Sequence, residues 1–121
     1  MPPIISLKKD YILIEPQENE YWEIWEAVGK LIKMPEYLDK NTIWLFSDKP
    51  LHIDFSDLYK LKDFIAEHYP QGDKYHNKTA IVAKMGLHLG LAESFAKIAN
   101  DLPFEIRVFS DLQSAEDWIT A

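Results

Sequence analysis

The sequence contains no cysteine and only four glycines among its 121 residues. The absence of cysteine excludes disulfides, thiol catalysis and cysteine-ligated metal sites. Basic residues are also few, because 13 Lys and Arg stand against 20 Asp and Glu and leave a net charge of −7. Nucleic acid and anionic membrane surfaces attract clustered Lys and Arg, so we expect no nucleic-acid partner, and the charge disfavours even transient membrane contact.

Long hydrophobic runs are absent as well. No apolar stretch approaches the roughly 18 residues that would cross a bilayer, and the first residues lack the basic and apolar regions of a signal peptide. A cytoplasmic protein is therefore expected. The length suits a single domain over residues 1–121, and the 47% of hydrophobic residues include four Trp, six Tyr and six Phe that can fill its core.

The stretch from Thr79 to Lys84 organises the rest of the chain. It is apolar without polar alternation until Lys84, which is typical of a strand buried on both faces of a parallel sheet. Segments of helical spacing lie before and after it. Gly86 supplies a turn at its carboxyl end, where open α/β sheets usually bind their ligands.

The remaining periodicities predict an α/β fold. Strands are expected over residues 4–8, 11–15, 42–46, 79–84 and 105–109. Helices are expected over about residues 20–33, 57–69 and 87–101, followed by a short last helix. The order β-β-α-β-α-β-α-β-α implies a mainly parallel five-stranded sheet with four helices, in which the N-terminal hairpin strand is antiparallel.

Polar residues at the helix starts predict caps. Asn19 is the expected N-cap of the first helix, Ser56 of the second, and Ser110 opens a capping box with Gln113 in the last. Four carboxylates near the first helix start are interpreted as a solvated face that matches the helix dipole. They are Glu18, Glu20, Glu23 and Glu26.

The C-terminal run Phe104-Glu105-Ile106-Arg107-Val108-Phe109-Ser110-Asp111-Leu112-Gln113-Ser114-Ala115-Glu116-Asp117-Trp118-Ile119 resembles the SpoIIAA-like branch of the STAS domain superfamily. Thr79-Ala80-Ile81-Val82, placed before a Gly-containing loop, fits the same pattern. The resemblance implies a non-enzymatic binding or regulatory module. Members of the superfamily act as anti-sigma factor antagonists, as parts of anion transporters, or as binders of small ligands and lipids.

In the antagonists, a phosphorylatable Ser lies in an Asp-Ser-Ser-Gly-Leu turn before the second helix. The corresponding turn here reads Asp54-Phe55-Ser56-Asp57-Leu58, so Phe55 stands at the acceptor position. Ser56 is the remaining candidate phosphosite, and a partner-switching signalling protein is one alternative function. The other interpretation of Ser56 is a helix cap, beside which Asp57 would repel an added phosphate.

Motifs of catalysis are missing: the chain has no G-x-S-x-G elbow, P-loop or G-x-G-x-x-G. His52 and Asp54 share one side of an extended segment, but a metal site needs more ligands. We expect no metal and no cofactor. A second alternative function is a small enzyme with a site around Asp48, Lys84 and His88.

The expected binding site lies at the carboxyl ends of the third and fourth strands, because loops that follow parallel strands converge there. Met85, Leu87 and Leu89 favour a small apolar or amphipathic ligand, or a protein partner, and Leu89 is expected to point outward. A homodimer is also consistent with such an exposed apolar cluster. The expected site residues are Ser47, Asp48, Lys84, Met85, Gly86, His88 and Leu89, with Trp22 at the rim.

Overall fold

The computed structural model describes residues 2–38, 40–68, 77–83, 87–100, 102 and 104–121. Its elements follow the expected order, and the α/β class with four helices and five strands is confirmed. A single 3-10 turn, η1, is added before the third strand. The elements are β1 Ile4–Leu7, β2 Tyr11–Glu15, α1 Tyr21–Lys33, η1 Pro35–Leu38, β3 Asn41–Leu45, α2 Phe55–His68, β4 Lys78–Val82, α3 Leu87–Ile98, β5 Glu105–Phe109 and α4 Leu112–Ile119.

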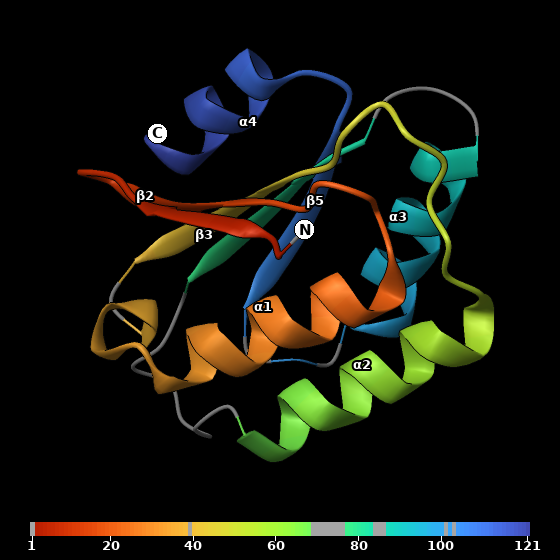
Figure 1. The fold of residues 1–121 in the computed structure, drawn as a ribbon. Coiled ribbons are helices and arrows are strands. Elements are labelled where there is room, and N and C mark those ends of the chain that lie inside the picture. The colour runs from red at the N-terminus through yellow and green to blue at the C-terminus, as the bar shows by residue number, and fades with distance from the viewer. Residues whose placement is uncertain (1, 39, 69–76, 84–86, 101, 103) are drawn as a thin grey trace.

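The strands lie in the sheet in the same order as in the chain, β1-β2-β3-β4-β5. β1 pairs with β2 antiparallel, and the three other pairs are parallel. When each crossover joins neighbouring strands with the same hand, every connecting helix falls on the same face of the sheet. Accordingly α1, α2 and α3 lie together below the sheet, while α4 lies above it (Figure 1).

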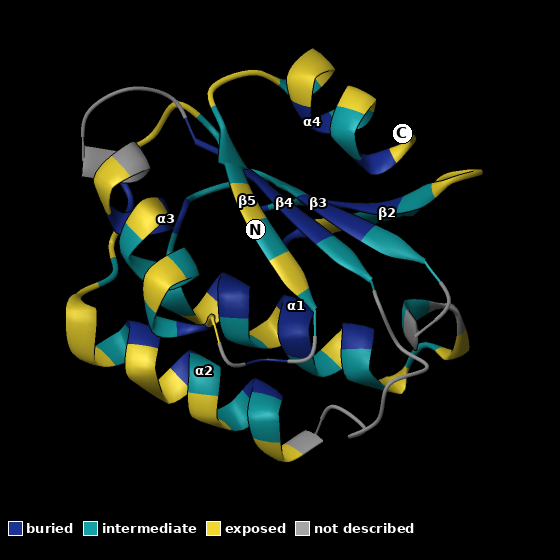
Figure 2. Ribbon diagram, turned by 180° about the vertical axis from the view of Figure 1, so that it is seen from behind, coloured by how far each residue is buried: buried dark blue, intermediate teal, exposed yellow. Residues whose placement is uncertain are grey.

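β4 occupies an interior position between β3 and β5. Ala80 is fully buried, and Ile81 and Val82 expose only 6% and 2% of their surface. Ile81 packs toward α3, whereas Ala80 and Val82 pack toward α4. The expectation of a strand buried on both faces is therefore confirmed, and the dark blue bands of β3 and β4 in Figure 2 show it.

The core has two parts, one on each face of the sheet. On the α4 face, Leu13 and Ile43 of the sheet meet Ala115 and Ile119 of the helix. On the opposite face, three helices contribute a larger set of apolar side chains, including Ile24, Leu61 and Leu91. The second part contains the cavity described below.

The expected caps of α2 and α4 are wrong, by two residues and by one residue. Asp54 caps the start of α2, because its carboxylate accepts the Asp57 backbone N–H at 3.0 Å. Ser56 lies inside the first turn. Asp111, and not Ser110, is the N-cap of α4, since its side chain accepts the Ser114 backbone N–H at 2.8 Å. In both cases an Asp carboxylate, within two residues of the expected Ser, is the stronger acceptor for an N–H at the positive helix end.

Candidate functional site

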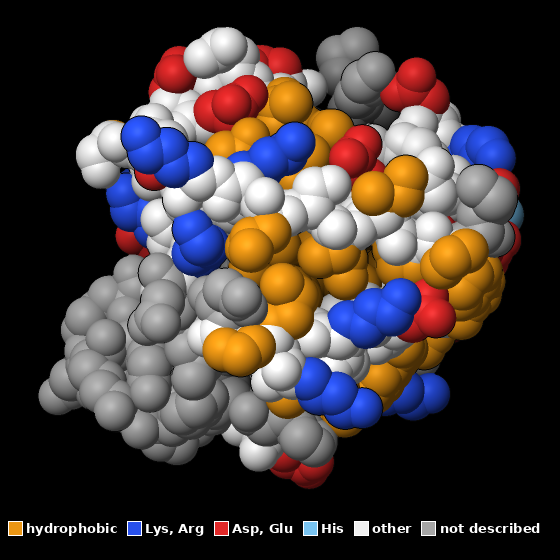
Figure 3. Space-filling model, turned by 60° about the vertical axis from the view of Figure 1, so that its left-hand side comes forward, with side chains coloured by type: hydrophobic (Ala, Val, Ile, Leu, Met, Phe, Trp, Pro, Cys, Tyr) orange, Lys and Arg blue, Asp and Glu red, His pale blue; other side chains and the backbone are white. Residues whose placement is uncertain are grey.

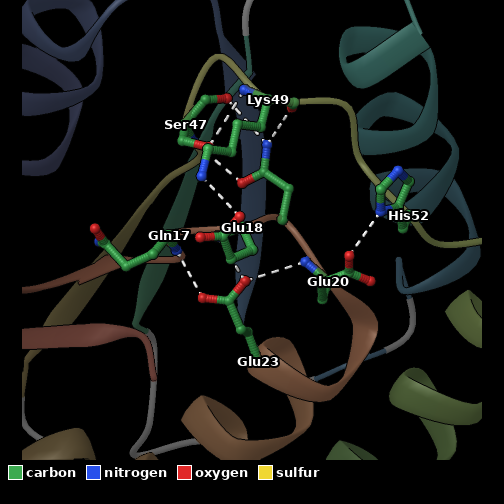
Figure 4. A network of polar contacts seen from close by, with 8 residues as sticks. Gln17, Glu18, Glu20, Glu23, Ser47, Lys49 and His52 are labelled. Carbon is green, nitrogen blue, oxygen red and sulfur yellow. Dashed lines mark hydrogen bonds and ion pairs between the residues drawn. The ribbon is translucent and has the colours of Figure 1, made fainter. Parts of the chain in front are cut away.

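The carboxyl ends of β2 and β3 are joined by a buried polar network centred on Glu23 (Figure 4). Glu23 is fully buried. One oxygen of its carboxylate accepts the Gln17 backbone N–H at 2.7 Å, and the other accepts those of Glu18 at 2.8 Å and Glu20 at 3.1 Å. Three donors compensate the cost of burying this carboxylate. The interpretation of Glu23 as part of a solvated face is therefore wrong.

Asn19 is the second buried member of this network. Its side chain donates to the carbonyls of Ser47 at 3.0 Å and Lys49 at 2.6 Å, and accepts the Ser47 N–H at 3.2 Å. Its φ of 55° is a left-handed conformation that Asn tolerates better than most residues. Glu20, and not Asn19, is the N-cap of α1. The expected cap is wrong because the Asn19 side chain is used to hold the loop after β3.

Two exposed pairs complete the network at the surface. Lys49 Nζ lies 2.7 Å from Glu18 Oε2, and His52 Nδ1 lies 2.8 Å from Glu20 Oε1. The hydrogen bond and charge of Lys49 lower the pKa of the Glu18 carboxyl. These exposed pairs contribute little to stability. They do join the segment that follows β2 to the segment that follows β3 at the surface, as Asn19 does in the interior.

The chemistry of this network is structural. Its backbone N–H groups are occupied by the protein's own carboxylate, so they are not free to stabilise a bound anion. In the described part of the chain no group of three His, Asp or Glu side chains could hold a metal ion. His52 pairs with Glu20 and Asp54 caps α2, so the structure gives the two residues separate structural partners.

Between the sheet and the layer of α1, α2 and α3 lies an apolar cavity of about 80 Å³. It is large enough to admit a small apolar group, although an engineered apolar cavity that binds benzene measures about 150 Å³. The Thr79 hydroxyl on its wall is engaged with that of Thr42 at 3.2 Å. The cavity is lined by Ile24, Val28, Leu31, Tyr37, Trp44, Phe46, Leu51, Ile53, Leu58, Leu61, Ile65, Thr79, Ile81, Leu91, Ala92, Phe95 and Phe104.

Tyr21 packs against the same apolar cluster from the first turn of α1. Its hydroxyl is buried and meets no hydrogen-bond partner among the described residues. Burial is the largest cause that raises the pKa of this hydroxyl; the nearby Trp25 indole opposes the rise, and the charges of Asp57 and Asp54 add to it. The side of α1 that faces the cavity cluster thus carries an unsatisfied polar group.

The expected site residues are only partly described. The Ser47 backbone binds Asn19, its hydroxyl accepts the Lys49 N–H at 3.3 Å, and Asp48 is exposed. Trp22 exposes 48% of its surface. The other members lie outside the described residues. These are Lys84, Met85 and Gly86, together with the side chains of His88 and Leu89, whose backbone belongs to α3.

Ser56 is exposed at the start of α2, and its hydroxyl donates to Asp54 Oδ1 at 2.7 Å. This hydrogen bond is the largest cause that lowers the pKa of the Asp54 carboxyl. The Ser56 side chain therefore supports the cap that Asp54 provides.

Sequence reasoning did not find the cavity or the buried role of Glu23. A Glu three residues after the N-cap is the usual partner in a capping box, so the position of Glu23 after Glu20 could have indicated its hydrogen bonds to the backbone. The cavity has no comparable signal, because it depends on how seventeen side chains from distant segments fit together.

No protein-family model, curated protein or solved structure matches this chain. Among the helices in the described ranges, none combines the length and the apolar character needed to cross a membrane.

Proposed function

We propose that this protein is a non-enzymatic, STAS-like binding module that holds a small apolar or amphipathic ligand. The observation that carries the proposal is the apolar cavity between the sheet and the three helices α1, α2 and α3. Small-molecule sites are usually concave and mostly apolar, with few polar groups. The sequence resemblance to SpoIIAA-like domains supports the same class of function.

The position of the cavity agrees with a ligand that approaches from the carboxyl ends of the strands. Phe46, Leu51 and Ile53 line it, and all three follow β3 directly in the chain. The loop between them contains Ser47 and Asp48, two members of the expected site. In this arrangement an alkyl chain enters the cavity, while a polar end remains near the loop.

The polar network and the wall of the cavity are expected to respond differently when a ligand binds. Asn19 and Glu23 fix the loops beside the cavity through five hydrogen bonds to backbone groups at 3.1 Å or less. The cavity wall consists of apolar side chains, which repack at lower cost than a buried polar network. Ligand entry is therefore expected to displace side chains of the helices and not the loops.

Titration with straight-chain primary alcohols from ethanol to octanol, followed by methyl NMR, tests the proposal. Shifts are expected at lining residues such as Ile24, Leu61 and Leu91, and affinity is expected to rise with chain length until the cavity is filled. Absence of saturable shifts for every alcohol contradicts the proposal. Native mass spectrometry of the purified protein adds an independent search for a ligand that co-purifies.

A matched pair of substitutions on α3 makes the test specific. Ala92 lines the cavity, whereas Ala96, one turn further along, does not. Ala92→Leu is expected to weaken alcohol binding by at least about fivefold, because about 0.8 kcal/mol is lost for each ligand CH₂ that is excluded. Ala96→Leu is the control and should leave affinity within about twofold.

A further inference from the structure

β1 is an edge strand of the sheet, and no strand of the described residues pairs with its outer side. It pairs with β2 alone in the sheet order, with Leu7 opposite Ile12 and Ile5 opposite Ile14. The Lys8 N–H donates to the Tyr11 carbonyl at 2.9 Å, which marks the first hydrogen-bonded pair of the hairpin. Because such pairs alternate in antiparallel strands, the backbone N–H and C=O groups of Ile5 and Leu7 point away from β2.

A groove runs beside this free edge, between β1 and the C-terminal half of α1. It is lined by Pro3, Ile5, Lys30, Lys33 and Met34 and has a volume of about 520 Å³. Three of these residues, Pro3, Ile5 and Met34, are apolar and are called the apolar floor below. Leu7 lies on the same face of the sheet as Ile5 and exposes 52% of its surface. The free edge and the apolar floor are therefore adjacent.

The same region is basic, although the whole chain carries a charge of −7. Lys30 and Lys33 line the groove, and Lys8 and Lys9 follow β1 in the hairpin turn. No ion pair joins these four lysines to a carboxylate within the described ranges. On the face of the molecule shown in Figure 3, hydrophobic side chains lie beside Lys or Arg side chains, with Asp and Glu side chains also among them.

We propose that β1 and this groove bind an extended acidic segment of a partner protein, which adds a strand to the sheet. An extended peptide uses all three features: it pairs with the free backbone groups, and the side chains that it turns toward the groove include apolar ones for the floor and carboxylates for the lysines. A docked helix would leave the backbone of Ile5 and Leu7 unpaired. A second copy pairing through β1 would bring a second set of the same lysines to the interface.

The sequence around β1 limits the length of the added strand. Pro2 and Pro3 precede the strand, and neither has an N–H to donate, so pairing cannot continue beyond Ile4 on that side. Lys8 and Lys9 end it on the other side. Short strands, prolines and lysines at an edge oppose uncontrolled aggregation, and they leave an edge suited to one short peptide.

Two fluorescein-labelled peptides of eight residues provide the test. In the acidic peptide, Val and Glu alternate at every second position, so that both face the groove, and Thr fills the positions between them; in the basic counterpart, Lys replaces each Glu. Fluorescence anisotropy should show saturable binding of the acidic peptide and at least about tenfold weaker binding of the basic one. The double substitution Lys30→Glu with Lys33→Glu should weaken binding of the acidic peptide at least about tenfold. The matched control is Lys60→Glu with Lys97→Glu, which changes the net charge equally on α2 and α3 and should alter affinity by less than about threefold.

Backbone amide exchange distinguishes strand addition from simple attraction of charges. Without peptide, the amides of Ile5 and Leu7 should exchange faster than that of Ser6; with acidic peptide, exchange of Ile5 and Leu7 should slow at least about tenfold. Binding without this protection, equal effects of the two double substitutions, or no binding at millimolar peptide would each overturn the proposal. So would sedimentation showing that the protein alone forms a dimer in which these two amides are already protected.

Discussion

Glu23 and Tyr21 lie two residues apart at the start of α1, yet their buried polar groups have opposite surroundings. The Glu23 carboxylate accepts three backbone N–H groups between 2.7 and 3.1 Å. The Tyr21 hydroxyl is buried without a partner in the described part of the chain, beside a cluster that contains a cavity. Hydrogen bonds thus fix the position of one side of the helix, whereas the other side is held by apolar packing that leaves a cavity.

This difference has a physical consequence for tolerance to change. A satisfied polar network has few alternative arrangements, since the loss of one partner leaves others buried and unpaired. An apolar region with a cavity accepts added volume and loses little when a polar atom without a partner is removed. Four tests of this contrast follow in order of decreasing expected effect.

The largest loss is expected for Glu23→Ala. The substitution leaves the backbone N–H groups of Gln17, Glu18 and Glu20 without their acceptor, which should lower the free energy of unfolding by about 3 kcal/mol or more. Denaturant unfolding measures the loss. Glu26→Ala on the exposed side of the same helix is the control and should change stability by less than about 0.5 kcal/mol. Equal losses in the two variants would contradict the structural role assigned to Glu23.

The second test concerns Asn19, which combines a left-handed backbone with side-chain hydrogen bonds. Asn19→Ala should cost about 2–3 kcal/mol, because it removes bonds to the backbone of Ser47 and Lys49 and also places Ala at a φ of 55°. Asn19→Gly keeps the backbone conformation accessible. Its smaller loss, measured by the same unfolding experiment, isolates the side-chain contribution. Full stability of Asn19→Gly would show that the hydrogen bonds are unimportant.

The third test compares packing on the two faces of the sheet. Ala115 of α4 is fully buried and does not line the cavity, whereas Ala92 of α3 does. Ala115→Leu should cost about 1–3 kcal/mol through overpacking, while Ala92→Leu should stay within about 1 kcal/mol of the wild type. Thermal unfolding of both variants measures the difference. A larger loss for Ala92→Leu would mean that the cavity does not accept the added side chain.

The smallest change is expected for Tyr21→Phe, which removes the buried hydroxyl without a partner. Stability should remain within about 0.5 kcal/mol or rise slightly. Tyr11→Phe is the control, because the Tyr11 hydroxyl donates to Glu116 at 3.3 Å and its loss should cost about 0.5–1 kcal/mol. A larger loss for Tyr21→Phe than for Tyr11→Phe would reveal a partner for the Tyr21 hydroxyl.

The pH dependence of Tyr21 follows from the same burial. Its pKa is raised in the folded state, so the folded protein retains the proton at a pH where the unfolded chain has begun to lose it. The contribution of this group to stability is complete below the ordinary tyrosine pKa of about 10, and it is lost as pH rises toward the folded value. Tyr21→Phe should therefore lose less stability than the wild type when the pH is raised above about 10.

The alternation of residues along the chain was sufficient to predict the elements and their order. Strand β4 was evident because Ala80, Ile81 and Val82 follow one another without a polar residue. The starts of α2 and α4 were misplaced because Asp54 and Asp111, and not the nearby Ser56 and Ser110, accept the backbone N–H groups of the first turn. Local sequence contains both candidates and does not decide between them.

The candidate site was harder to predict, because its parts come from distant segments. Asn19 reaches Ser47 and Lys49 across nearly thirty residues, and nothing in either segment alone indicates the other. Trp22 lies away from the apolar stripe of α1 and is exposed, but the other members expected at the site were grouped with it only because they follow strands three and four in the sequence. A cavity forms where neighbouring side chains do not fill the space between them, and the hydrophobicity of individual positions does not reveal this.

The sequential order of the strands has a consequence for how the protein forms during synthesis. Each strand from β2 onward pairs with the strand made just before it, so the sheet can grow as the chain leaves the ribosome. α4 emerges after all five strands, and until it docks, Leu13, Ile43 and Val82 remain uncovered on one face. The nascent chain therefore passes through a stage with a finished helical layer and an exposed apolar sheet, at which a chaperone would find its binding surface.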